Sequence, residues 1–135
     1  MIMEERVRNT LSKAERLNGK LAVEALFDKG VSARCIYPLR ATYLVCEQGK
    51  APVSILISVP KRRFHHAVDR NRMKRQVREA YRVRKHRLCA LMEERGQSLS
   101  LAFVCVADKP CSSSSVAKSV AKLLGRIEDN LMHNA

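Results

Sequence analysis

The chain has 135 residues, a formal net charge of +13 at pH 7 and no tryptophan. This length predicts a single domain over residues 1–135 with a modest core, and the lack of a long apolar run excludes a transmembrane helix. Residues 1–10 are too polar for a signal peptide, and we expect them to be flexible. Five cysteines without a C-x-x-C pair predict free thiols in a reducing cytoplasm rather than a disulfide or zinc framework.

The first predicted element is a helix that opens at Asn18 or Gly19. Apolar residues, among them Val23 and Phe27, recur along it at helical spacing. Gly30 has the composition of a C′ residue and should end this helix.

Three strands are predicted next, over residues 31–36, 39–46 and 52–60. In the second and third of these, residues alternate between two faces, which is typical of strands with one buried face. A turn signal at residues 48–50 separates them. We therefore expect the second and third strands to pair as a hairpin.

Residues 61–87 hold twelve Lys and Arg but two acids, which gives this segment +10 of the whole net charge. Asp69 is a candidate N-cap for a helix that runs to residue 95, with Val68 and Met73 as a hydrophobic staple. Apolar residues follow at i, i+3/i+4 spacing along it, interrupted by Arg84. The predicted helix therefore has one apolar face and one cationic face.

Arg70 and Arg72 would lie in the first turn of this helix, where the helix dipole disfavours cations by roughly 0.3–1 kcal/mol each. A polyanion at this position would reverse that sign, because free backbone N–H groups and guanidinium groups both bind phosphate. The alternative is an ordinary solvated helix face. The one-sided charge favours a nucleic-acid surface.

The rest of the chain predicts an interior strand over residues 99–107 and a last helix capped by the serines of residues 112–115. The fold class is therefore α+β, a two-layer α/β sandwich with about four strands in a mixed sheet and three helices, in the order α-β-β-β-α-β-α.

No residue is predicted to be a chemical catalyst. The thirteen acids are mostly single, so no carboxylate cluster is evident for the two metals of a nuclease. His65, His66 and Asp69 form an H-H-x-x-D pattern, but it lacks a third ligand with suitable spacing. We therefore predict no protein metal site.

The run Arg70-Asn71-Arg72-Met73-Lys74-Arg75, preceded by Val59-Pro60-Lys61-Arg62, resembles the RNR signature of the bacterial ribonuclease P protein component. The resemblance extends from about Leu17 to Leu91. It implies a ribosomal-protein-like fold with a left-handed βαβ crossover. It also implies a monomeric cytoplasmic protein whose partners are the catalytic RNA and precursor tRNA, with Mg²⁺ bound mainly by RNA. The expected RNA-subunit-binding residues are Lys61, Arg62, Arg63, Arg70, Asn71, Arg72, Lys74, Arg75 and Arg78.

The resemblance further implies a cleft between the first helix and the sheet that receives the 5′ leader of precursor tRNA. Phe27 and Tyr43 match aromatic positions of this cleft, and Arg40 and Val23 are further members of it. Each aromatic residue has an alternative role as an ordinary core residue. A base stacked on Tyr43 would contribute roughly 1–3 kcal/mol.

Three hypotheses remain for function. The first is a subunit that helps the catalytic RNA remove the leader in a Mg²⁺-dependent reaction. The second is a structural RNA-binding ribosomal or assembly protein, for which cleft residues would not affect cleavage. The third is a standalone basic nuclease, which would hydrolyse RNA as purified protein.

Overall fold

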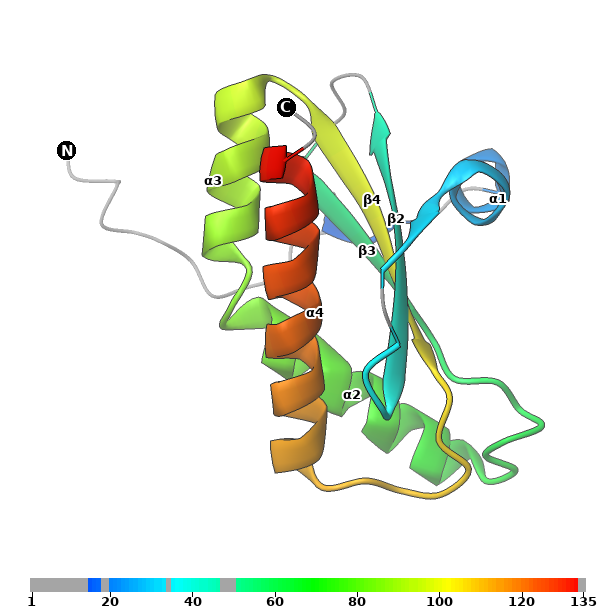
Figure 1. Cartoon of the computed structure of the whole chain (residues 1–135). Coiled ribbons are helices and arrows are strands. Elements are labelled where there is room, and N and C mark those ends of the chain that lie inside the picture. The colour runs from blue at the N-terminus through cyan, green and yellow to red at the C-terminus, as the bar shows by residue number, and fades with distance from the viewer. Residues whose placement is uncertain (1–14, 18–19, 34, 47–50, 134–135) are drawn as a thin grey trace, which may run out of the picture.

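The computed structural model describes residues 15–17, 20–33, 35–46 and 51–133 (Figure 1). Within these residues the chain forms four helices and one four-stranded sheet. In chain order the elements are α1 (Lys20–Lys29), β1 (Val31–Ser32), β2 (Leu39–Cys46), β3 (Val53–Ser58), α2 (Ala67–Arg82), α3 (His86–Arg95), β4 (Ser98–Cys105) and α4 (Ser113–His133).

The sheet has the order β1-β2-β4-β3. Strand β4 lies between β2, to which it is antiparallel, and β3, to which it is parallel. The predicted hairpin of β2 and β3 is therefore wrong. β4 is the most continuously apolar strand, and the central position buries both of its faces, with Phe103 on one side and Ala102 on the other.

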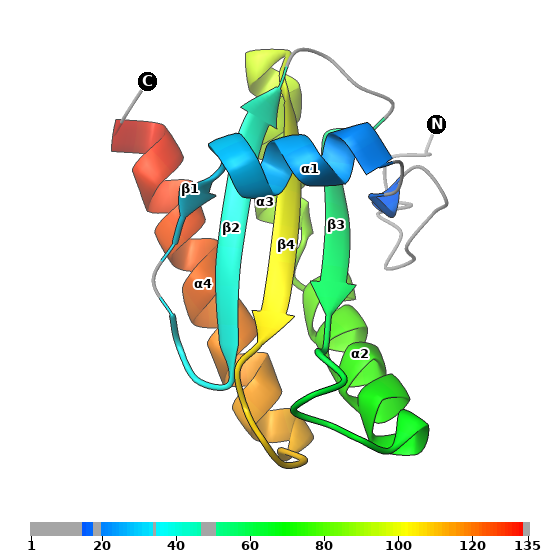
Figure 2. The ribbon, with the colours of Figure 1, turned by 90° about the vertical axis from the view of Figure 1, so that its right-hand side faces the viewer.

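The connection from β3 through α2 and α3 to β4 is left-handed, as the family resemblance implied. Figure 2 shows β3 and β4 pointing the same way with the connecting helices behind the sheet. Viewed with those helices in front and the strands pointing upward, the path moves to the left. This is the uncommon hand, since right-handed crossovers are the general rule.

Helix α1 crosses one face of the sheet, whereas α2, α3 and α4 cover the other (Figure 2). The main core lies between the sheet and these three helices, where the rings of Tyr81 and Phe103 meet with centroids 6.2 Å apart. On the opposite face Leu26 of α1 is fully buried. A Cβ on Gly30 would lie 2.7 Å from the Thr42 side chain, so glycine allows the end of α1 to approach β2 closely.

The predicted single helix over residues 69–95 is two helices, which corrects the expected helix count. Arg84 occupies a place in the helical stripe that otherwise packs on the core, and the chain turns at residues 83–85 so that Arg84 is exposed. The Arg84 N–H donates to the Tyr81 carbonyl at 2.9 Å, which tightens this last turn. Helix α3 then rises beside α4 (Figure 1).

Two predicted helix ends are confirmed. Gly96 follows α3 with φ 65°, and the Gln97 N–H donates to the Met92 carbonyl, which is the Schellman pattern. The Ser112 hydroxyl accepts from the Ser115 N–H at 3.1 Å and so caps α4.

Candidate nucleic-acid interface

The loop between β3 and α2 is anchored by its own side chains. Phe64 is 3% exposed and belongs to the core. Arg63 Nη1 donates to the Val106 carbonyl at 3.0 Å and to Asp108 Oδ1 at 2.8 Å. Arg63 therefore ties the loop to the end of β4, and its charge is already paired with a carboxylate. Its main role is to hold the loop that belongs to the predicted RNA-binding surface.

The N-cap of helix α2 lies three residues earlier than predicted. His66 is the N-cap and has no side-chain capping bond, whereas Asp69 lies in the first turn, where its charge suits the helix dipole. Val68 is 77% exposed, so the predicted staple is absent, and the assignment of Asp69 as N-cap is wrong. The chain is already helical from Ala67, before the Asp69 position at which the sequence pattern placed the N-cap.

Arg70 also supports the loop. Its Nη1 donates to the Phe64 carbonyl at 2.8 Å and to the His65 carbonyl at 3.1 Å. These carbonyls come just before the helix, so the guanidinium closes the loop onto the first turn of α2. Part of the Arg70 guanidinium fork is used in this way, and the remaining N–H groups can still meet a phosphate.

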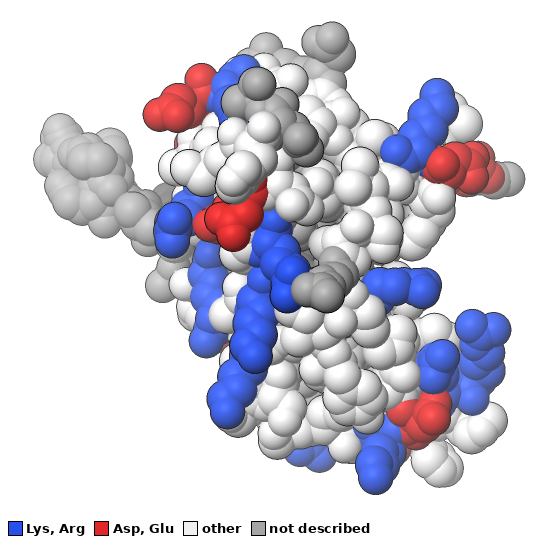
Figure 3. All heavy atoms as spheres, viewed as in Figure 1, with Lys and Arg blue, Asp and Glu red and all other residues white. Residues whose placement is uncertain are grey.

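The neighbouring cations are more available. Lys61, Arg62, Arg72 and Arg75 are exposed, and within the described part of the chain none of them makes a hydrogen bond or ion pair. In Figure 3, Lys and Arg side chains form a column near α2 and the α2–α3 bend, and a second group beside the loop that precedes α2. This distribution gives the loop and α2 a concentrated positive field.

The cationic residues of α2 divide between two flanks of the helix. At about 100° per residue, Asn71, Lys74 and Arg78 lie on one side of its exposed face. Arg72 and Arg75 lie on the other side, where they line a groove against α4. The sequence pattern alone suggested one ridge, and the second flank became visible only with the position of α4.

Glu79, one of the two acids of α2, is paired. Glu79 Oε1 accepts from Arg82 Nη2 at 2.7 Å, and this hydrogen bond is the main cause that lowers the pKa of Glu79. Glu79 therefore stays ionised and offsets Arg82. Glu79 does not pair with Arg72 or Arg75.

The predicted leader cleft is only partly assembled. Phe27 of α1 is 49% exposed, and Val23 lies one helical turn earlier and is partly buried. Arg40 is exposed on β2 and shares a face of the sheet with Thr42, beside which α1 ends. These three residues are on the α1 side of the molecule and remain available to a ligand.

Tyr43 lies on the other side, and the prediction that it offers a stacking surface in the cleft is wrong. Side chains alternate along β2, so Tyr43 points opposite to Thr42. It is 3% exposed and belongs to the core beneath the helices. The alternative role, an aromatic residue packed under a helix, is the one that the structure shows.

The described residues contain no group of three or more His, Cys, Asp or Glu side chains placed to hold a metal ion. His65 and His66 are both exposed in the loop. In the same described part of the chain, no helix is long and apolar enough to cross a membrane. All five cysteines are free thiols.

Comparison with known proteins identifies the family. The family model described as ribonuclease P matches residues 11–128. The chain belongs to the ribonuclease P protein family. It is 42% identical over 126 residues to a ribonuclease P protein component of Porphyromonas gingivalis, covering 93% of this chain and 91% of that protein. A ribonuclease P protein component of Chlorobaculum tepidum is 38% identical over 88 residues, or 63% of this chain and 57% of that protein.

Solved structures of ribonuclease P proteins share the fold. The Staphylococcus aureus protein aligns with a TM-score of 0.63 and 21% identity over 84% of this chain and 94% of its own. The Thermotoga maritima protein aligns with a TM-score of 0.61 and 19% identity over 83% and 96%. Family membership makes the chain an accessory protein subunit of an endoribonuclease ribonucleoprotein that acts in tRNA 5′ processing.

Two features of this ribonuclease P protein were missed from the sequence. Gln76 Nε2 donates to the Cys111 carbonyl at 2.9 Å and to Ser113 Oγ at 3.1 Å, which joins α2 to the start of α4. Arg84 lines the groove between these helices. Its place in an otherwise apolar stripe was the sequence signal that could have marked it.

Proposed function

We propose that the basic surface of α2 and its preceding loop docks this protein on the catalytic RNA of ribonuclease P. The observation that carries the proposal is the set of exposed cations without described partners at Lys61, Arg62, Arg72 and Arg75. Arg63 and Arg70 hold the loop that presents them. The proposed contacts are Lys61, Arg62, Arg63, Arg70, Asn71, Arg72, Lys74, Arg75 and Arg78.

The second proposed role is to hold the 5′ leader of precursor tRNA on the α1 side of the sheet. Phe27 offers an exposed ring on which a base can stack. Arg40 offers a cation for a leader phosphate, and Val23 extends the apolar side of α1. Mature tRNA has no leader, so these contacts favour substrate over product.

The cleavage reaction is proposed to use Mg²⁺ held mainly by RNA. The described residues of this chain do not fit a Mg²⁺ site, because their acids do not converge. The protein therefore contributes binding and charge neutralisation. Positive charge near the docked RNA compensates phosphate repulsion, so the complex assembles with fewer bound cations.

The test is cleavage of a labelled precursor tRNA by a cognate catalytic RNA at low Mg²⁺, with and without the protein. We expect cleavage at the mature 5′ end to require both components. Stimulation should fade as salt rises, because the docking contacts are electrostatic. If folded protein binds the RNA and leaves cleavage unchanged, the chain is a structural RNA-binding protein. RNA hydrolysis by the protein alone would point to a nuclease.

A further inference from the structure

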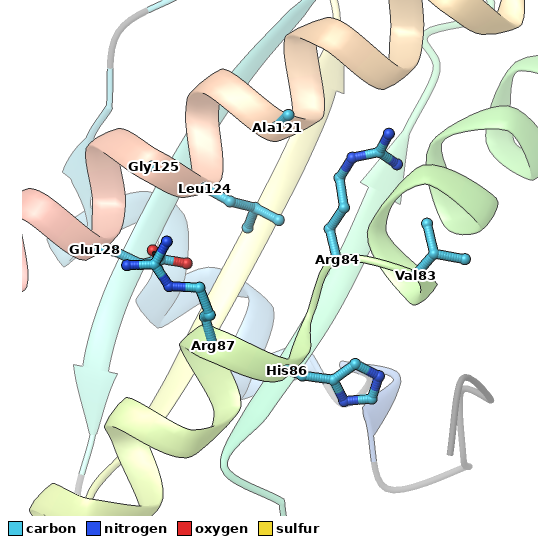
Figure 4. Close-up of a pocket in the computed structure, with 8 residues that line it drawn as sticks. All are labelled: Val83, Arg84, His86, Arg87, Ala121, Leu124, Gly125 and Glu128. Atoms are coloured by element: carbon cyan, nitrogen blue, oxygen red, sulfur yellow. Dashed lines mark ion pairs between the residues drawn. The ribbon is translucent and has the colours of Figure 1, made fainter. Parts of the chain in front are cut away.

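A groove runs along the helical face between α4 and the α2–α3 bend. Its first part has a volume of about 570 Å³ and lies between α2 and the start of α4. Its second part has a volume of about 430 Å³ and lies between the bend and the middle of α4 (Figure 4). Both parts are lined by Val83 and Arg84, so they form one continuous groove.

The walls of this groove are cationic. Arg72 and Arg75 line the first part, Arg84 lines both parts, and Arg87 lines the second. Arg84 uses Nη1 to reach the Ala80 carbonyl at 3.1 Å, and the rest of its guanidinium stays exposed. Figure 4 shows Arg84 extending from the bend and Arg87 from the start of α3, both toward α4.

The acids of the groove do not cancel this charge. Glu79 is paired with Arg82, which does not line the groove. Glu128 lies 3.7 Å from Arg87, but its side chain is 12% exposed whereas that of Arg87 is 85% exposed. A phosphate can therefore reach the Arg87 guanidinium from solvent while Glu128 remains below it.

The floor of the groove consists of small and apolar residues of α4. Ala117, Ala121, Gly125 and Leu124 form it on the α4 side. A Cβ on Gly125 would meet no atom within 4 Å, so the space above it is open. An apolar surface between guanidinium groups can contact the ribose and base faces of an RNA strand whose phosphates lie along the walls.

We propose that this groove holds a strand of the catalytic RNA that continues from the basic surface of α2. The inference rests on the proposed function, because Arg72 and Arg75 belong to both surfaces and connect them. Charge complementarity selects the occupant: an RNA backbone supplies repeated anions along the whole length of the groove. Arg84 and Arg87 contact its phosphates, and Gly125 leaves room for the strand.

The first test compares the Arg84→Gln/Arg87→Gln double variant with the wild-type protein in binding to the catalytic RNA. Each lost phosphate contact lowers the slope of log affinity against log salt by about 0.7–0.9. Between about 50 and 200 mM salt, the double variant should therefore lose affinity roughly tenfold less than wild type. An unchanged slope overturns the inference.

The second test adds a carboxylate to the floor. Gly125→Glu should weaken RNA binding much more than Gly125→Gln, which has the same shape without the charge. Asn130→Glu adds the same charge to an exposed site of α4 outside the groove and should have little effect. Equal binding by the Gly125→Glu and Gly125→Gln variants would show that no RNA phosphate comes near this floor.

These outcomes are separable from failure of the proposed function. Circular dichroism first establishes that each variant is folded. If wild-type protein does not bind the catalytic RNA, the proposed function fails. If wild type binds and an Arg72 variant weakens binding while the Arg84/Arg87 and Gly125 variants do not, only the groove assignment is wrong.

Discussion

Lys85 Nζ donates to Glu15 Oε2 at 2.6 Å, and the two side chains are 6% and 15% exposed. This pair joins the α2–α3 bend to a segment 70 residues earlier in the chain. The same segment lies along the outer edge of β3, where the Leu17 N–H donates to the Ile55 carbonyl at 2.7 Å. The pair therefore holds the α2–α3 bend in place and also holds the segment that covers the edge strand β3.

Replacing Lys85 with Met should lower the free energy of unfolding by up to about 3–5 kcal/mol, because the largely covered Glu15 carboxylate loses this cation. The measurement is urea unfolding of the two single variants and the Lys85→Met/Glu15→Leu double variant. The double variant should recover much of the loss, since no buried charge remains. Additive losses would mean that the two residues act independently.

Replacing Tyr81 with Phe should leave the protein as stable or stabilise it by about 1 kcal/mol. The Tyr81 hydroxyl is the buried side-chain polar atom that lacks a hydrogen-bond partner among the described residues. Burial is also the main cause that raises the pKa of Tyr81. Thermal and urea unfolding measure the change. A loss above about 1 kcal/mol would show that the hydroxyl has a real partner, for which the Cys89 thiol is the nearest candidate.

Phe27→Ala should weaken binding of leader-bearing precursor tRNA to the holoenzyme, by roughly 1–3 kcal/mol for one lost stacking contact. Mature tRNA should bind as before. The matched control is Leu21→Ala, which also removes an exposed apolar side chain from α1. Equal losses for precursor and mature tRNA would remove Phe27 from the leader site.

Arg72→Ala and Arg70→Ala should separate docking from loop support. Arg72 makes no hydrogen bond or ion pair in the described part of the chain, so its loss should reduce the salt slope of RNA binding by about 0.7–0.9 without changing stability. Arg70→Ala should also loosen the loop, because Arg70 bonds the Phe64 and His65 carbonyls. Hydrogen exchange of loop amides distinguishes the two. Identical exchange in both variants would contradict the supporting role of Arg70.

Glu128→Gln should change how stability depends on pH. Burial raises the pKa of Glu128, with Asp129 adding to the rise and Arg87 opposing it. A raised pKa in the folded state means that the carboxyl favours folding when protonated and that this contribution is lost as pH rises. The free energy of unfolding of wild type should therefore fall relative to that of the variant as pH increases above about 4.5.

Asp129→Asn should reduce this pH effect without abolishing it, because Asp129 adds to the rise of the Glu128 pKa but burial is its main cause. The free energy of unfolding is measured by urea unfolding at each pH. If it depends on pH in the same way for wild type and for Glu128→Gln, the raised pKa is contradicted. The same Glu128→Gln variant should bind catalytic RNA more tightly, since it frees Arg87 from its carboxylate partner.

Local patterns predicted the elements better than their pairing. The alternation of residues in β2 and β3 is visible in the sequence, but nothing in it says that β4 separates them. The same alternation does not say which face is covered by three helices, so Tyr43 was assigned to the wrong side. The start of α2 was predicted too late because Asp69 was taken as the N-cap, whereas it lies inside the first turn of the helix.

The basic surface was predictable because its signal is charge, which needs no tertiary information. The sequence did not predict which of its cations support the loop and which remain free for RNA. Arg63 and Arg70 have the same sequence character as Arg72, yet they bond to carbonyls and a carboxylate of the protein. Those partners lie in the folded loop and at the end of β4, and only the fold brings them within reach.

The position of β4 also bears on synthesis of the protein. Strands β2 and β3 are made early, but each of them has β4 as its inner neighbour, and β4 begins at residue 98 of 135. Until that segment leaves the ribosome, the earlier strands have no central partner and the sheet cannot close. Long-range pairing of this kind slows folding and exposes strand edges meanwhile. We therefore expect a nascent chain that ends before residue 98 to depend on chaperones and to resist proteases poorly.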